Sequence, residues 1–249
     1  MKIIGYDGFN YNGNEVRLNE IFNTIKWNQK IFDKILIFFH KPDDLNLYKQ
    51  FQGVPNIDLR MLPENTPDLS MQDLFNLVNN NSQPEDIKCF SNLDSIFTES
   101  WNNVTIADDV FMFLTNRSTE DGSPDGGVGK PSWTEGLDLF NQQGILDPTK
   151  FVNYNDPNVP STIYGRWFFA QCGWSWKTVK PIAGKAFLGH RGAEHVFLRE
   201  VRNAGYKAMS GALKYPTYHN HASNIRTDRQ MSIVDSAVNT GRLYPQEVL

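Results

Sequence analysis

The 249-residue chain has few of the features on which secreted and membrane proteins depend. It has two cysteines, Cys89 and Cys172, with no spacing typical of a metal or disulfide motif, which suits a reduced compartment. No stretch approaches the roughly 18–20 apolar residues of a membrane span. The N-terminus, MKIIGYDGFNYNG, has no sustained apolar run of the signal-peptide kind. We therefore expect a soluble, cytoplasmic protein.

The net charge of −4 is small, but the charges are unevenly distributed. Residues 1–150 have 12 Lys and Arg against 22 Asp and Glu, whereas residues 151–249 have 12 against 6. A basic C-terminal portion favours a phosphate-bearing ligand or a polyanion as a partner. Neutralisation of the acidic portion by the basic one explains the asymmetry equally well.

Alternating apolar patterns predict an α/β fold. Strands are predicted over 2–6, 34–40, 57–62, 87–97 and 109–116. Helices are predicted over 16–28, over the segment that Ser70 caps, and over about 194–204. Strands separated by helices predict a mostly parallel sheet with helices on its faces, in one domain over 1–226. The Gly/Pro-rich range 118–165 reads as a long loop, either a substrate-covering lid or a disordered insertion, and 227–249 as a polar tail.

Asn92 and Asp94 lie at the polar end of the predicted strand 87–97. In open α/β sheets, ligands bind beyond the carboxyl ends of the strands. An aspartate there can bind a hard divalent cation whose other positions take phosphate oxygens. Turn formation or helix capping explains the same residues without a ligand.

The segment YHNHASNIR contains His219, His221 and Arg226. Residues at i and i+2 share one side of a strand, so both imidazoles can ligate a metal or contact phosphate. Arg226 can pair with a diphosphate through its planar guanidinium. Hydrogen-bonded structural histidines are the alternative.

The segment FLGHRGAEHVFL places Glu194 on the first turn of a helix that follows a loop bounded by Gly189 and Gly192. The helix dipole stabilises a carboxylate there, so a helix-start acid is a complete explanation. An ionised carboxylate beside a glycine loop also meets the requirements of a general base.

Four segments in this order resemble a family of small GT-A-type glycosyltransferase-like proteins: SNLDSIF, DVFMFLTNRS, AQCGWSWK, and FLGHRGAEHVFL with the ending YHNHASNIR. The family's counterparts are a shortened DxD metal motif, an S-Q-D-x-W-x-F segment, and a G-x-x-G-C-D-N segment followed by H-x-H-x-S-x-x-R. The resemblance covers about residues 88–226. It implies a GT-A-like, Rossmann-like fold.

The resemblance implies a divalent cation, Mn²⁺ or Mg²⁺, that stabilises the diphosphate of a nucleotide-sugar donor as a leaving group. The metal ligands that it implies are Asp94, His219 and His221. The donor contacts expected with it are Tyr6, Asp7, His40, Asn92 and Arg226.

For the acceptor, the resemblance implies that Glu194 orients or deprotonates a hydroxyl. The other acceptor or sugar contacts that it implies are Gln171, Trp174, Gly192 and His195. Core packing is the alternative for Trp174 and its neighbour Trp176. Several positions depart from the family. Cys172 replaces an aspartate, Glu194 lengthens an aspartate by one methylene, and Ala193 and His195 replace a cysteine and an asparagine.

The resulting hypothesis is a metal-dependent glycosyltransferase that moves a sugar from a nucleotide-sugar donor to a hydroxyl. One alternative keeps this chemistry with a nucleic-acid acceptor, as in phage enzymes that glycosylate modified DNA bases, and is motivated by the basic C-terminal portion. The other is a non-catalytic nucleotide- or sugar-binding protein on the same fold, motivated by Cys172.

Overall fold

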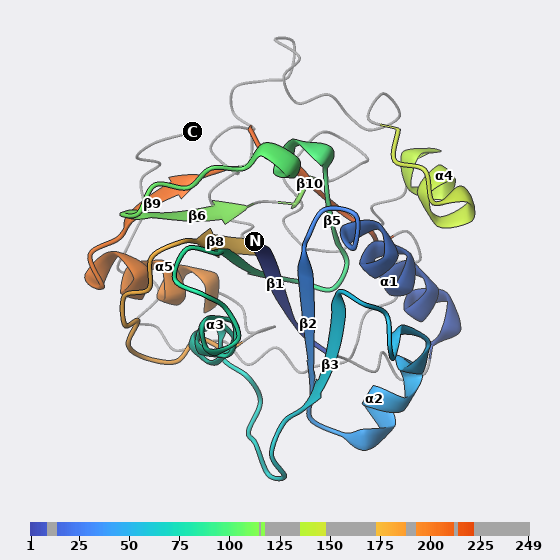
Figure 1. Cartoon of the computed structure of the whole chain (residues 1–249), viewed down its shortest axis with the longest axis horizontal. Helices are drawn as coiled ribbons and strands as arrows, with labels where there is room; N and C mark the ends of the chain where they lie inside the picture. Colours follow the sequence, from blue (N-terminus) through green and yellow to red (C-terminus); the bar gives the residue numbers. More distant parts are fainter. Residues whose placement is uncertain are drawn as a thin grey trace.

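A seven-stranded sheet forms the centre of the protein (Figure 1). The computed structural model describes residues 1–8, 14–114, 116–117, 135–147, 173–187, 193–211 and 214–221. The strand order is β3-β2-β1-β4-β8-β6-β9. The strands are β1 (Lys2–Asp7), β2 (Lys34–Phe39), β3 (Ile57–Met61), β4 (Ile87–Ser91), β6 (Val110–Leu114), β8 (Gly173–Trp176) and β9 (Lys207–Ser210).

The sheet is mostly parallel, as predicted. Strands β3, β2, β1 and β4 pair in parallel, and so do β6 and β9. The exception is β8, which runs antiparallel to both β4 and β6. Because β8 reverses the direction twice, all six other strands point their carboxyl ends toward one edge of the sheet.

The predicted strand over 87–97 is wrong as a single element. The chain turns after β4, where the Ser95 amide donates to the Asn92 carbonyl (3.1 Å), and continues as β5 (Ser95–Phe97). Strand β5 joins a second sheet of order β5-β10-β7, with β7 (Asn116–Arg117) and β10 (Thr217–His219). The turn therefore places Asp94 between the two sheets.

Helices cover both faces of the large sheet (Figure 1). One face packs against α1 (Glu15–Asn28), and near it lie α2 (Pro42–Leu47) and two short 3₁₀ helices, Lys49–Phe51 and Glu99–Asn103. The other packs against α3 (Met71–Asn80) and α5 (Ala193–Asn203). Among the described residues, no helix has both the length and the apolar character needed to cross a membrane.

Helix α1 buries more than an apolar face. Its first apolar residue, Val16, is 58% exposed. Leu18, Ile21 and Ile25 are buried. Beside them runs a second buried row of polar side chains at helical spacing: Arg17, Glu20, Thr24 and Asn28. The helix therefore buries an apolar stripe and a polar stripe together.

Helix α4 (Glu135–Gln143) lies within the range predicted as a long loop. Residues 135–147 are the only described part of 118–165. Leu137 and Phe140 of α4 are fully buried against Trp27, Ile96 and Tyr218. This part of the range is therefore an ordered helix that packs beside α1.

The two tryptophans of β8 lie in the core. Trp174 and Trp176 are 1% and 0% exposed, and both pack among Phe90, Phe111 and other aromatic rings of the α3–α5 face. The Trp176 ring stacks on Phe111 with centroids 5.4 Å apart. This burial supports the core-packing alternative for both residues.

Candidate metal and nucleotide site

Three adjacent parallel strands end where the candidate site lies. Asp7 ends β1, His40 directly follows β2, and Asp94 follows β4. Because β2, β1 and β4 are neighbours with the same direction, these three side chains come to one edge of the sheet. This is the edge at which open α/β sheets bind ligands.

Asp94, His219 and His221 form a compact cluster at this edge. One ligand atom from each residue lies within 4.8 Å of the others. Nε2 of His219 is 2.7 Å from Oδ2 of Asp94, and the two imidazole rings are 5.1 Å apart and nearly perpendicular. The two histidines lie close together, as predicted, but they do not lie on one strand. Strand β10 ends at His219, and a turn in which the His221 amide donates to the His219 carbonyl (3.1 Å) brings the second ring back.

Asp94 is buried, at 5% exposure, and its two oxygens have different surroundings. Oδ2 accepts from the Arg17 guanidinium and contacts His219. Oδ1 is buried and has no hydrogen-bond partner among the described residues. Such an orphaned carboxylate oxygen is costly in a protein interior. A bound cation would satisfy it.

The charges around Asp94 keep it ionised. Burial alone would raise the pKa of the Asp94 carboxyl, but the charges of His219 and Arg17 outweigh burial and hold that pKa below its ordinary value. One carboxylate oxygen and two imidazole nitrogens are a donor set that fits a divalent ion. The described residues therefore fit the cation that the sequence analysis implies.

Asn220 fixes the two histidines that flank it. It is fully buried. Its backbone N–H donates to the backbone carbonyl of Asp94 (2.7 Å). Its side-chain nitrogen donates to the backbone carbonyl of Glu20 (2.8 Å) and to Thr24 Oγ1 (3.1 Å). A pair of amide hydrogen bonds also joins it to Asn141 of α4. The turn with the histidines is thus tied to α1, to α4 and to the loop after β4.

Asp7 and His40 form a second pair at the same edge. His40 Nε2 lies 3.4 Å from Asp7 Oδ1. The contact with the Asp7 carboxylate is the largest influence on His40 and raises the pKa of the imidazole above its usual value, against the effect of partial burial. Asp7 thus favours the protonated form of the His40 imidazole at this edge of the sheet.

Glu194 and His195 lie at the start of α5. A short turn connects the end of this helix to β9, so its start lies toward the edge where the strands end. Helix α5 covers the face opposite α1. Burial raises the pKa of the half-buried Glu194 carboxyl and lowers that of the His195 imidazole. A carboxyl with a raised pKa is suited to proton transfer.

The remaining predicted residues fall into two groups. Tyr6 is fully buried, and its hydroxyl accepts from the Asn28 side chain (2.9 Å), so its side chain packs in the core. Asn92 is exposed in the turn before Asp94. Gln171, Gly192 and Arg226 lie outside the described residues, as do Gly189 and Cys172.

Sequence reasoning missed Arg17, Glu20 and Asn220. The available signal was the polar row of α1: an arginine, a glutamate, a threonine and an asparagine recur on one side of an otherwise apolar helix. A buried charged row of this kind needs partners. Asn220 stands between two candidate ligands, and nothing in the sequence shows that its own side chain points into the protein.

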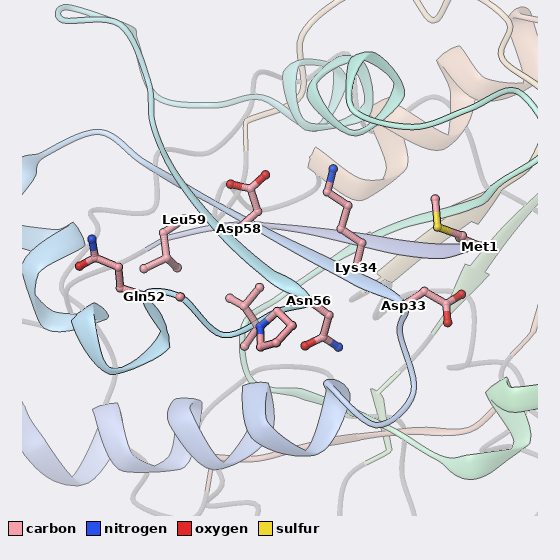
Figure 2. Close-up of a pocket in the computed structure, with 10 residues that line it drawn as sticks. Met1, Asp33, Lys34, Gln52, Asn56, Asp58 and Leu59 are labelled. Carbon is pink, nitrogen blue, oxygen red and sulfur yellow. The ribbon is translucent and has the colours of Figure 1, made fainter.

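A separate surface cavity of about 480 Å³ lies at the other end of the strands (Figure 2). It is lined where β1, β2 and β3 begin, by residues that include Met1, Asp33, Lys34 and Asn56. None of its lining residues belongs to the cluster around Asp94.

No known protein-family model matches this chain, and no curated protein sequence matches it. Solved structures with some similarity include TarS of S. aureus in complex with UDP-GlcNAc, at 11% identity over 52% of this chain and 36% of TarS, with a TM-score of 0.34. Mannose-6-phosphate isomerase of Helicobacter pylori has 18% identity over 50% and 56%, with a TM-score of 0.33. The galactosyltransferase LgtC with donor and acceptor sugar analogues has 10% identity over 71% and 58%, with a TM-score of 0.34.

The matched part of this chain spans less than two thirds of each of these three proteins. At such TM-scores the similarities carry no argument about function. The structure itself shows a mixed α/β fold with a mostly parallel seven-stranded sheet. It also shows a cluster of one aspartate and two histidines beyond the carboxyl ends of the strands.

Proposed function

We propose that the protein is a metal-dependent glycosyltransferase that moves a sugar from a nucleotide-sugar donor to a hydroxyl acceptor. The observation that carries this proposal is the Asp94, His219 and His221 cluster with its orphaned carboxylate oxygen. Its place beyond adjacent parallel strands is where an α/β sheet binds nucleotides. These three residues would hold the cation, Mn²⁺ or Mg²⁺, which supplies positive charge to the diphosphate leaving group.

The other residues then have the following roles. His40, with its raised pKa, donates a hydrogen bond to the nucleotide portion of the donor, and Asp7 holds the imidazole in place. Glu194 accepts the proton of the acceptor hydroxyl. The bond from the anomeric carbon to the diphosphate breaks, and the bond from that carbon to the acceptor oxygen forms. Arg226, Gln171, Gly192 and His195 remain proposed contacts to donor, acceptor or sugar.

A donor panel tests the proposal. The full chain is incubated with nucleotide sugars that differ in base and sugar, each with Mn²⁺ and with EDTA, and the melting temperature and nucleoside diphosphate release are measured. A ligand at about 100 times its dissociation constant adds about 2.7 kcal/mol of stability. We expect one donor to raise the melting temperature and to release its diphosphate, both only with metal. A metal-dependent shift without any release would favour a binding protein. No response to any donor would refute the proposal.

A further inference from the structure

The buried ion pair of Arg17 and Glu20 contacts Asp94 through Arg17 and has no role in the proposed chemistry. Both residues belong to α1 and are nearly inaccessible, at 1% and 4% exposure. Nη1 of Arg17 is 2.8 Å from Oε2 of Glu20, and Nη2 donates to Oδ2 of Asp94. Burying three charges is expensive. We therefore ask what each of the three buried charges contributes to the site.

The geometry gives a reason for Arg17. Its guanidinium also donates to the carbonyl of Asn220, the residue between the two histidines. The planar guanidinium has donors in fixed directions, so one side chain holds both Asp94 and the histidine turn. Because Arg17 and His219 both engage Oδ2, Oδ1 is left as the oxygen available to a cation.

The charges give a reason for Glu20. Arg17 and Asp94 alone would sum to zero, and a neutral pair attracts a cation weakly. With Glu20 included, the three side chains sum to one negative charge when both histidines are neutral, which is the form in which an imidazole ligates a metal. At the lower effective dielectric of a protein interior, a difference of one charge near a divalent ion is worth well over its value in water.

We propose that the Arg17–Glu20 pair is a positioning unit for the cation site: Arg17 orients Asp94 and the histidine turn, and Glu20 cancels the charge of Arg17 so that the site keeps its attraction for a divalent ion. This inference rests on the proposed function, because it takes the cluster as a cation site. Neither residue touches the reacting atoms. Their effect is therefore on cation affinity first and on activity only through it.

The test is Co²⁺ affinity in the full chain, measured by calorimetry and by the visible absorption of the bound ion. Glu20→Gln keeps the size of the side chain and a carbonyl oxygen that accepts from Arg17, and it removes the charge. Glu15→Gln is the matched control, because Glu15 is exposed on the first turn of the same helix. We expect Co²⁺ binding to weaken about tenfold in Glu20→Gln and to stay within about twofold of the unaltered chain in Glu15→Gln.

Arg17→Lys tests the orientation separately. Lysine keeps the charge but is a point donor without the planar fork, so it cannot hold Asp94 and the Asn220 carbonyl in the same way. We expect weaker Co²⁺ binding and a changed absorption spectrum in a protein that still unfolds cooperatively in urea. A purely structural role would lower the free energy of unfolding of both variants and leave Co²⁺ affinity in the folded protein unchanged, and that result would overturn the inference.

The outcomes separate the inference from the proposed function. If the unaltered chain binds Co²⁺ and no donor is turned over, the glycosyltransferase proposal fails, and Glu20→Gln still decides the inference. If Glu20→Gln binds Co²⁺ as tightly as Glu15→Gln does, the inference fails whatever the activity. If the unaltered chain binds no Co²⁺, the cation site and the inference are both wrong.

Discussion

At the scale of single residues, the Asp7–His40 pair makes a prediction about pH. Asp7 raises the pKa of His40, so NMR titration should place it above the unperturbed value of about 6.5. The pair's contribution to stability is then fully present below the unfolded-state pKa and is lost as the pH rises through the folded-state pKa. Asp7→Asn should lower the His40 pKa. His195 is an internal reference, because burial shifts its pKa downward. A His40 pKa at or below that of His195 would contradict the pair.

A second prediction at this scale concerns Glu194. Burial raises the pKa of its carboxyl, so its ionised form appears at higher pH than that of an ordinary glutamate, near 4.3. If Glu194 is the general base, the transfer rate should increase as the pH rises through this raised pKa. Glu194→Gln should remove this increase from the pH–rate profile and abolish most of the activity. Because the folded-state pKa is raised, Glu194 favours folding most at low pH and less as the pH rises through that value. A folded Glu194→Gln protein with full transfer activity would exclude the role.

At the scale of elements, helix α3 begins with a complete capping box. Ser70 Oγ accepts from the Asp73 amide (3.1 Å), and the Asp73 carboxylate accepts from the Ser70 amide (3.0 Å). Ser70→Ala should cost about 1 kcal/mol of unfolding free energy, measured by urea denaturation. Ser82→Ala is the control, because Ser82 lies beyond the other end of the helix and its hydroxyl donates to the carbonyl of Asn79 in the last turn. Equal costs in the two variants would mean that the cap contributes nothing of its own.

The elements that sequence reasoning predicted well are those with a local signal. The capping box predicts the start of α3, and the apolar runs predict β1 and β2. Helix α4 was missed because it lies in a Gly/Pro-rich range and is stabilised by Leu137 and Phe140 against residues far away in the sequence. The break between β4 and β5 was missed because Ser95–Phe97 has the same apolar pattern as the strand before it, and its partner β10 is distant.

In the candidate site, too, some residues were predicted from the sequence and others were not. Asp94 and the histidines were predicted as a set, and the structure brings them together. Arg17 was missed because a charged residue in a helix is usually on its solvent side, and only tertiary packing reveals that this one is buried. The burial of Tyr6 was not predicted, because a residue near a strand's carboxyl end can point either to the site or into the core.

At the scale of the whole molecule, the antiparallel insertion of β8 keeps β6 and β9 parallel to the strands on its other side. All carboxyl ends except that of β8 therefore meet at one edge, where the Asp94 cluster and the Asp7–His40 pair lie. The start of α5 points toward this edge, and the surface cavity of Figure 2 lies at the other end of the strands. The arrangement brings the ionisable groups with shifted pKa values that are suited to chemistry toward the carboxyl ends of the strands.

The central claim is that Asp94 with two histidines binds a divalent ion that a nucleoside diphosphate requires. The most direct measurement is calorimetric titration of Mn²⁺ into the full chain with and without UDP, compared with Asp94→Asn and with the control Asp108→Asn, whose carboxylate is exposed and paired with Lys177. We predict one Mn²⁺ bound per chain, tighter with UDP, unchanged in Asp108→Asn and lost in Asp94→Asn. Equal Mn²⁺ binding by Asp94→Asn and the unaltered chain would contradict the account.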